Sequence, residues 1–464
     1  MTRLPRLVVA APGSGHGKTM IATGLMAALR AQGRTVSPHK VGPDYIDPGY
    51  HALAAGRPGR NLDPHLQSEG LVAPLLAHGA GTPAPADVAV IEGVMGMFDG
   101  ATGTGGFSST AHVARLVQAP VVLVVDCAAT ARSVGALVHG FSRFDERVPV
   151  AGVILNNVGS ARHEREAREG VAAAGVPVLG CVPRLPDVVV PSRHLGLVPV
   201  AERGPRAHAA VEALAGLVGR HVDLTAVLEV AATAPDLPVA PWSPAAAVGT
   251  AVPGRPRVAV AAGAAFTFGY AETTELLAAA GAEVVTFDPL HDTRLPAGTV
   301  GLVIGGGFPE VHAEALSRNG SLRDSVRELV ASGGVVAAEC AGLLYLGRAL
   351  QDRPMCGVLP VTATMGPRLT LGYRTATALG DSLLTRAGEQ VTGHEFHRTR
   401  ACADTGAAPP AAWAWAGTDG ADVREGFATP RVHASYLHTH WAGHPQLARR
   451  FVAAAAGAEA GAAA

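Results

Sequence analysis

Short apolar runs rich in β-branched residues alternate with amphipathic helical stretches along most of this 464-residue chain. Each run ends in small or polar residues, which is typical of strands in a parallel sheet with helices on both faces. A Pro- and Ala-rich stretch at 232–256 interrupts the alternation, which then restarts. The sequence therefore predicts an α/β protein with two doubly wound domains. The expected strands are Leu7–Ala11, Val88–Glu92, Val121–Asp126, Gly152–Asn156, Arg257–Ala262, Glu283–Phe287, Leu302–Ile304 and Gly334–Ala338.

The composition limits the class of protein. Charged residues make up 16% and apolar residues 48%, which suits large buried sheets and argues against disorder. The formal net charge is −1, so the chain lacks the basic footprint of a nucleic-acid-binding protein. The apolar run near the N-terminus is too short to span a membrane. The five cysteines lie far apart without C-x-x-C spacing, which favours a reducing, cytoplasmic location.

A glycine-rich turn, Ala11-Pro-Gly-Ser-Gly-His-Gly-Lys-Thr19, lies between the first strand and an expected helix at Met20–Ala31. Backbone amides of such a loop bind phosphates, the lysine reaches the terminal phosphates, and the threonine hydroxyl can ligate Mg²⁺. Pro12 replaces the first glycine of the usual P-loop pattern, so the loop is a variant. It predicts an ATP site formed by Gly15, Gly17, Lys18 and Thr19.

Acidic residues follow or lie near the expected strand ends. Glu92 ends the strand Val88–Glu92, and Asp99 lies a few residues beyond. A carboxylate at the C-terminal end of a strand faces the ligand crevice of an open α/β sheet. Asp44 and Asp47 occupy a turn-rich segment, where they would bind metal or orient the substrate, although such acids are also common in ordinary turns.

In the second half, Cys340 follows an apolar run and precedes small residues and an apolar helix. Backbone amides and a helix N-terminus at such a turn stabilise a thiolate and an oxyanion, although a buried structural thiol would have the same sequence. The amides of Gly305–Gly307 and Ala341 are candidates for an oxyanion hole. Base candidates lie among the histidines of 431–441, and spacing alone does not choose between them.

A nucleotide site and a reactive thiol in one chain suggest two coupled half-reactions. ATP can activate a carboxylate as an acyl phosphate, while a thiolate releases ammonia from glutamine. Ammonia then attacks the acyl phosphate and forms an amide.

These motifs resemble those of the cobyrinic acid a,c-diamide synthase family, which includes the hydrogenobyrinic acid enzymes, over almost the whole chain. The first half is similar to dethiobiotin synthetase-like P-loop domains, and the second to the cobyric-type branch of class I glutamine amidotransferases, which are flavodoxin-like. The resemblance is carried by Ala11–Thr19, Val41–Pro48, Glu92–Gly100, Arg193–Leu197, Gly305–Glu310, Ala338–Gly342, Gly393–His397 and Ala434–His438. It implies domains at 1–231 and 257–453, a linker at 232–256 and an Ala-rich tail at 454–464.

For the second half, the resemblance implies that Cys340 is the nucleophile of a glutaminase, with Gly306, Gly307 and Ala341 around the oxyanion. His438 would raise the nucleophilicity of the thiol, and His440 is the second choice. Ordinary class I domains carry Glu where this chain has His440, so the resemblance implies a dyad. What orients His438 stays open.

For the first half, the resemblance implies an ATP- and Mg²⁺-dependent site that amidates the a and c acetates of a corrin polycarboxylate. Thr19, Asp47 and Glu92 would serve the metal, Asp99 the acyl phosphate or ammonia, and Asn156 the adenine. L-glutamine is a further expected partner. A homodimer is possible, but the sequence does not decide the oligomeric state. Substrate-binding residues would be Asp44, Tyr45, Asp47 and Arg193, with His194 and Lys40 as further candidates.

Several alternatives remain at this stage. The substrate is hydrogenobyrinate or cobyrinate, and the same chemistry serves cobyric acid synthases and enzymes that amidate nickel tetrapyrroles. A different class is a P-loop regulatory ATPase with a degraded amidotransferase-like module. An intact Cys340 and His438 argue against that reading.

Overall fold

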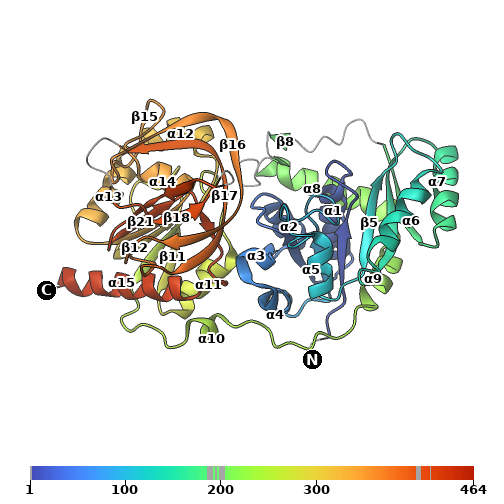
Figure 1. Cartoon of the computed structure of the whole chain (residues 1–464), viewed down its shortest axis with the longest axis horizontal. Coiled ribbons are helices and arrows are strands. Elements are labelled where there is room, and N and C mark those ends of the chain that lie inside the picture. The colour runs from blue at the N-terminus through green and yellow to red at the C-terminus, as the bar shows by residue number, and fades with distance from the viewer. Residues whose placement is uncertain are drawn as a thin grey trace. The chain divides into compact units, whose positions relative to one another are not determined.

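The chain divides into two compact units, Met1–Trp242 and Ser243–Ala464 (Figure 1). The computed structural model describes residues 3–184, 192–193, 196–197, 204–403, 409–417 and 420–463, without the side chains of 192–193, 196–197 and 461–463. The boundary between the units lies inside the segment 232–256, which contains a short helix, α10 (Pro244–Val248).

In the described part of the N-terminal unit, seven strands form one parallel sheet in the order β3-β2-β4-β1-β5-β6-β7. Two of the strands expected in this unit, Val88–Glu92 and Val121–Asp126, have the bounds that the sequence predicts. The strands are β1 (Arg6–Ala10), β2 (Val36–Val41), β3 (Arg60–Leu62), β4 (Val88–Glu92), β5 (Val121–Asp126), β6 (Val150–Val158) and β7 (Val178–Pro183). A separate backbone pairing joins β8 (Ser192–Arg193) to β9 (Gly196–Leu197).

Helices cover both faces of this sheet (Figure 1). Helices α1, α2 and α8 contact one another on one face, whereas α4 contacts α5 and α6 contacts α7. The helices are α1 (Lys18–Ala31), α2 (Asp47–Ala55), α3 (Pro64–Gln67), α4 (Glu69–Gly81), α5 (Thr110–Leu116), α6 (Val134–Phe144), α7 (Ala161–Ala173), α8 (Pro205–His221) and α9 (Leu224–Ala232). The chain passes from β1 toward one edge of the sheet, to β2, and from β4 toward the other edge, to β5. This reversal of direction creates the crevice where α/β sheets bind ligands.

The C-terminal unit is built around a second sheet. In the described residues its order is β11-β10-β12-β13-β21-β20, parallel except for β20, and the first five strands follow the flavodoxin-like order. The doubly wound fold predicted for both halves is thereby confirmed. The strands are β10 (Arg257–Ala261), β11 (Glu283–Phe287), β12 (Thr299–Ile304), β13 (Val335–Glu339), β20 (Phe427–Ala428) and β21 (Val432–Ser435). The helices are α11 (Ala271–Ala279), α12 (Pro309–Arg318), α13 (Gly320–Ala331), α14 (Ala341–Leu346) and α15 (Gln446–Ala463).

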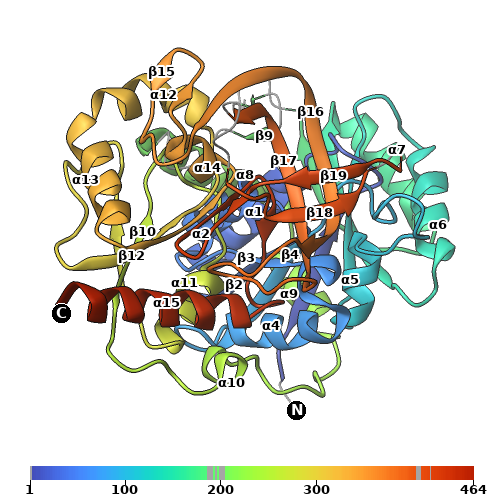
Figure 2. The ribbon, with the colours of Figure 1, turned by 60° about the vertical axis from the view of Figure 1, so that its left-hand side comes forward.

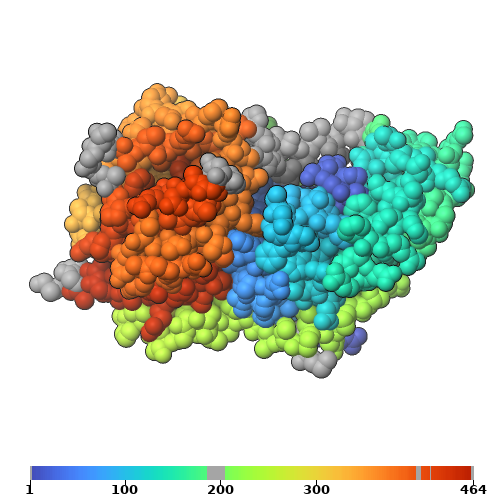
Figure 3. All heavy atoms as spheres, in the orientation of Figure 1, coloured from blue at the N-terminus to red at the C-terminus, as the bar shows by residue number. Residues whose placement is uncertain are grey.

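A further, mostly antiparallel sheet in this unit is absent from the expectations. Two long strands, β16 (Val361–Ala378) and β17 (Gln390–Ala403), pair along most of their length and arch together over the unit (Figure 2). The region of these strands (orange) forms much of the face of the unit seen in Figure 3. The other strands are β14 (Ala349–Leu350), β15 (Arg353–Pro354), β18 (Trp413–Ala416), β19 (Asp422–Glu425) and β22 (His438–Thr439).

The C-terminal helix α15 packs against β10, β12 and β13. It extends to Ala463, so the Ala-rich residues from 454 onward continue a helix. Within the described ranges, neither α15 nor any other helix has the length and apolarity needed to cross a bilayer.

Candidate active sites

The phosphate loop joins β1 to α1 through two glycines in the left-handed region. Gly15 has a φ of 86° and Gly17 a φ of 87°, which residues with side chains rarely adopt. A Cβ atom on Gly17 would lie 2.2 Å from Nδ2 of Asn156, so this position also requires glycine for space. Helix α1 then begins at Lys18, two residues before the expected start.

Neighbouring strand ends hold the loop in place. Asn156 of β6 donates from Nδ2 to the carbonyl oxygen of His16 at 3.0 Å, and the Asp126 amide of β5 donates to His16 Nδ1 at 2.9 Å. Asn156 therefore contacts the loop backbone. Its expected contact with adenine stays a prediction.

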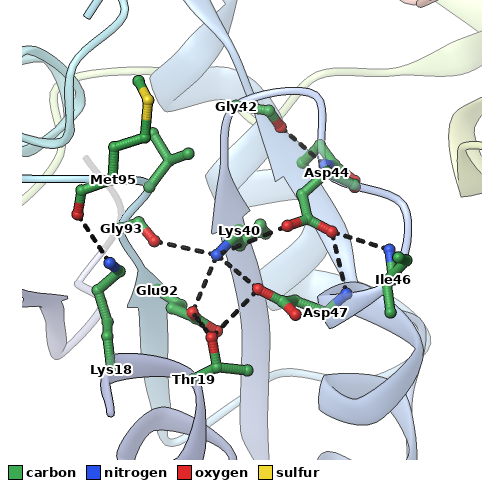
Figure 4. Close-up of polar contacts among 12 residues, drawn as sticks. Lys18, Thr19, Lys40, Gly42, Asp44, Ile46, Asp47, Glu92, Gly93 and Met95 are labelled. Atoms are coloured by element: carbon green, nitrogen blue, oxygen red, sulfur yellow. Dashed lines mark hydrogen bonds and ion pairs between the residues drawn. The ribbon is translucent and has the colours of Figure 1, made fainter. Parts of the chain in front are cut away.

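Lys18 lies against the segment that follows β4. Its Nζ donates to the carbonyl oxygen of Met95 at 2.8 Å (Figure 4). Burial, together with the nearby Lys40 ammonium, lowers the pKa of Lys18 to about 8. In the same segment, Asp99 accepts a hydrogen bond from the Gly96 amide at 3.1 Å, so Asp99 shapes the backbone beside Lys18.

A cluster of charged side chains lies next to Thr19 (Figure 4). The Thr19 hydroxyl donates to Glu92 Oε1 at 2.5 Å and lies 3.3 Å from Asp47 Oδ2. Lys40 Nζ lies 2.8 Å from Asp47 Oδ2, 2.9 Å from Glu92 Oε1 and 3.9 Å from Asp44 Oδ2. The structure thus brings Thr19, Asp44, Asp47 and Glu92 together, as the sequence predicts. It adds Lys40 at their centre.

Burial and charge have opposite effects on the pKa values in this cluster. Burial alone would lower the pKa of Lys40, but Asp47, Glu92 and Asp44 outweigh it and raise that pKa. Burial would raise the pKa of Glu92, but Lys40 and the hydrogen bond from His51 hold it well below its usual range. His51 Nε2 donates to Glu92 Oε2 at 2.6 Å, which leaves Oε1 directed at Thr19 and Lys40. Burial, and after it Asp44, raises the pKa of Asp47.

The donor atoms suit Mg²⁺, which prefers oxygen ligands and usually retains several waters. The hydroxyl of Thr19 and the carboxylates of Asp47 and Glu92 supply such oxygens. Within the described ranges no group of three or more His, Cys, Asp or Glu residues converges as a ready-made metal cage. A metal at this site would therefore also need phosphate and water oxygens, as is usual beside a P-loop.

Replacing Lys40 with Met should destabilise the N-terminal unit strongly. The substitution leaves the buried Glu92 and Asp47 carboxylates without their ammonium, which typically costs about 3–5 kcal/mol. Denaturant unfolding of the variant measures this loss. The control is Arg162→Met, which breaks an exposed i,i+4 pair with Glu166 and should change stability little. Equal losses in the two variants would contradict the compensating role of Lys40.

In the C-terminal unit, Cys340 occupies a strained turn between β13 and α14. Its φ is 49° and its ψ is −102°, an uncommon conformation for a residue with a side chain, and such strain is concentrated at functional sites. The Cys340 amide donates to the Ser435 carbonyl of β21 at 2.7 Å, which fixes the turn to the neighbouring strand.

Backbone amides approach the thiol as the sequence predicts, with one difference. Burial, and after it the charge of Glu310, raises the pKa of Cys340 to about 12, and hydrogen bonds from the N–H groups of Ala341 and Gly307 oppose this. The amide of Gly306 instead donates to the Phe268 carbonyl at 3.0 Å, because Phe268 pairs with this turn. The amide of Gly306 is therefore directed away from the thiol. The oxyanion donors that fit are Gly307 and Ala341.

His438 lies against the same glycine turn. A Cβ atom on Gly306 would lie 2.4 Å from His438 Cε1, so the missing side chain makes room for the imidazole. Burial, with smaller contributions from His394 and His397, lowers the pKa of His438 to about 3. The imidazole is therefore neutral at pH 7, which is the form that a general base needs, and the same burial weakens its basicity.

His440, the second choice for the base, has a different environment. Its Nδ1 accepts from the Ala442 amide at 3.3 Å, and its Nε2 lies 3.6 Å from Glu272 Oε2. Its ring lies 4.1 Å from that of Tyr270. The first contact occupies Nδ1 and the second places a carboxylate beside Nε2, which favours His438 as the base.

The structure gives little information on Tyr45 and Arg193, two of the predicted substrate residues. The side chain of Tyr45 is buried in the turn before α2. The backbone of Arg193 belongs to β8, but its side chain and all of His194 lie outside the described residues.

Sequence reasoning missed two residues at these sites, His51 and Glu339. His51 is a single histidine on a helix, and no motif marks it. Glu339 immediately precedes Cys340, and this position next to the nucleophile could have identified it.

Comparisons with known proteins are consistent with this division of the chain. Residues 7–198 match the "CobQ/CobB/MinD/ParA nucleotide binding domain" family, and residues 257–446 match the "CobB/CobQ-like glutamine amidotransferase domain" family. The chain is 58% identical to the hydrogenobyrinate a,c-diamide synthase of Streptomyces coelicolor, over 97% of both chains. It is 55% identical to that of Mycobacterium tuberculosis, over 98% of both. Identity to the cobyrinate a,c-diamide synthase of Gloeobacter violaceus is 44%, over 96% of both.

Proposed function

Because this chain belongs to the family of hydrogenobyrinate and cobyrinate a,c-diamide synthases, which are carbon–nitrogen ligases, we propose that it amidates hydrogenobyrinate with ATP and glutamine. The reacting groups are the a and c acetate carboxylates of the corrin ring. One observation supports this most directly. A strained cysteine with two amides on its sulfur occurs in the same chain as a phosphate loop with its acidic cluster.

The C-terminal unit supplies ammonia in this proposal. The Cys340 thiol transfers its proton to His438, and the sulfur attacks the side-chain carbonyl carbon of glutamine. The resulting oxyanion accepts hydrogen bonds from Gly307 and Ala341. The imidazolium returns the proton to the leaving nitrogen, which departs as ammonia. Water then hydrolyses the thioester, releases glutamate and restores the thiol.

The N-terminal unit consumes the ammonia. An acetate oxygen of the substrate attacks the γ-phosphorus of ATP, the bond to ADP breaks, and an acyl phosphate forms. Ammonia attacks the acyl carbon, loses a proton and expels phosphate, which leaves the amide. Lys18 and the loop amides bind the phosphates, and Thr19, Asp47 and Glu92 would hold Mg²⁺. The ion would neutralise charge on the transferring phosphoryl group.

Asp44, in the same acidic turn as Asp47, has a separate role in this scheme. Carboxylates near the acyl phosphate attract ammonium and can take the proton that the attacking nitrogen loses. Tyr45 and Arg193 are assigned to the substrate, since a polycarboxylate needs hydrogen-bond donors and positive charge. Asp99 acts through the segment that it shapes beside Lys18.

The metal-free ring is favoured as substrate because identity is 55–58% to relatives named for hydrogenobyrinate and 39–44% to those named for cobyrinate. The test supplies purified enzyme with ATP, Mg²⁺, glutamine and each ring in turn, and the products are analysed by mass spectrometry. Each amidation replaces OH by NH₂ and lowers the mass by about one unit. Two amidations of the metal-free ring are expected. Turnover of cobyrinate alone would reverse the choice of ring, and no amidation of either would contradict the proposal.

A further inference from the structure

We propose that Glu339 is the carboxylate that orients His438 and so takes the place of the missing third member of a triad. The inference rests on the proposed glutaminase function and adds to it a positioning residue. Glu339 is the last residue of β13, directly before the nucleophile, so the strand that presents Cys340 also presents this carboxylate.

One oxygen of Glu339 is fixed by hydrogen bonds. Oε1 accepts from the Thr439 amide at 3.1 Å and from the Thr439 hydroxyl at 2.6 Å. The hydroxyl in turn accepts from Trp441 Nε1 at 3.1 Å. This chain of donors comes from the segment that also carries His438, so the carboxylate and the imidazole are held together.

The other oxygen faces the imidazole. Glu339 Oε2 lies 3.9 Å from Nδ1 of His438, whose side chain is fully buried. This separation exceeds a hydrogen bond, but catalytic hydrogen bonds are often long without substrate and shorten in the complex. A carboxylate at Nδ1 favours the tautomer with the proton on that nitrogen. Nε2 is then left with a lone pair to accept the proton of the Cys340 thiol.

The position where ordinary class I domains carry the glutamate is taken by His440, which contacts Glu272 and Tyr270. The two histidines of this segment therefore each lie near a different carboxylate. Glu339 is the carboxylate near His438, and Glu272 provides a matched residue for comparison.

Charged and titratable side chains lie near both the thiol and the imidazole. Burial, and after it Glu310 of α12 and Glu339 of β13, raises the pKa of Cys340. Burial, and after it His394 and His397 of β17, lowers that of His438. Burial raises the pKa of Glu339 itself to about 7, and the hydrogen bonds from Thr439 oppose this. The carboxylate is thus largely ionised above pH 7, where it can hold the proton of His438 on Nδ1.

The test compares Glu339→Gln with Glu272→Gln in the full-length enzyme. Gln at 339 keeps an oxygen for Thr439 but loses the charge. We expect kcat for glutamine hydrolysis to fall about 10- to 100-fold in this variant, with the KM for glutamine within about twofold. Glu272→Gln should retain wild-type kcat, and ammonia-dependent amidation should persist in both.

A second readout follows the thiol directly. Alkylation of Cys340 by iodoacetamide, followed by peptide mass spectrometry to exclude the exposed Cys402, is measured from pH 6 to 9. In Glu339→Gln the loss of a negative charge beside the thiol by itself favours the thiolate. A roughly tenfold fall in the rate at pH 7 would therefore report the loss of a correctly oriented imidazole. Thr439→Val keeps the carboxylate but removes a donor, so it should give a smaller loss of kcat in the same direction.

The outcomes separate this inference from the proposed function. If Cys340→Ala and His438→Asn abolish glutamine hydrolysis but Glu339→Gln matches wild type in kcat and alkylation profile, Glu339 is not the orienting group. A loss of kcat in Glu272→Gln as large as that in Glu339→Gln also overturns it. If Cys340→Ala still hydrolyses glutamine, the glutaminase assignment itself fails, whatever Glu339 does.

Discussion

Cys340→Ala should lose glutamine-dependent amidation by a factor of about 10³ or more and keep ammonia-dependent amidation within about twofold. The thiol is the sole group that forms the thioester in the proposed reaction, whereas the acyl phosphate forms in the other unit. Product mass spectrometry with glutamine or with ammonium chloride as nitrogen source measures both rates.

The matched control is Cys402→Ala. Cys402 is an exposed cysteine of the same unit, on β17, and carries no role in the proposed reaction. Its removal should leave both rates unchanged. Glutamine-dependent turnover that survives in Cys340→Ala would show that another group attacks glutamine.

Lys18→Ala should reduce amidation about 10²- to 10³-fold with either nitrogen source, because the charge that stabilises the transferring phosphoryl group is lost. Lys18 is largely buried beside Met95, and its ammonium is the group that the loop places for the terminal phosphates. Initial rates with glutamine and with ammonia, at saturating ATP, measure the effect.

Arg30→Ala provides the control, because Arg30 lies in the last turn of the same helix and is exposed. It should amidate normally. Alkylation of Cys340 should also proceed in Lys18→Ala, since the thiol lies in the other unit. Normal amidation by Lys18→Ala would contradict the reading of this loop as the phosphate site.

Much of the fold was predictable because buried parallel strands have a simple signature. β4 and β5 are continuous apolar runs that end in an acid, and their bounds agree with the sequence prediction. The long strands β16 and β17 lack this signature. β16 contains Gly366 and Pro367, and its burial pattern is irregular, so neither alternation nor a continuous apolar run marks it.

The same reasoning explains what was predictable of the sites. Glu92 is at a strand end, where parallel topology collects ligand-facing side chains, and the structure brings it to Thr19. The roles of Lys40, His51 and Glu339 depend on which oxygen of a carboxylate each group contacts. Such contacts form between strands and helices that are distant in sequence, so spacing does not encode them. Gly306 is a predicted site residue whose amide instead donates to the Phe268 carbonyl. No local sequence pattern indicates this pairing.

The bonds from Asn156 and Asp126 to His16 have a consequence for the kinetics of nucleotide binding. They tie the phosphate loop to two neighbouring strand ends, so the backbone that receives a nucleotide is held by the sheet itself. Little conformational entropy is then lost on binding. Association should therefore follow a single fast phase that is linear in nucleotide concentration, with no slow rearrangement of the loop after the encounter.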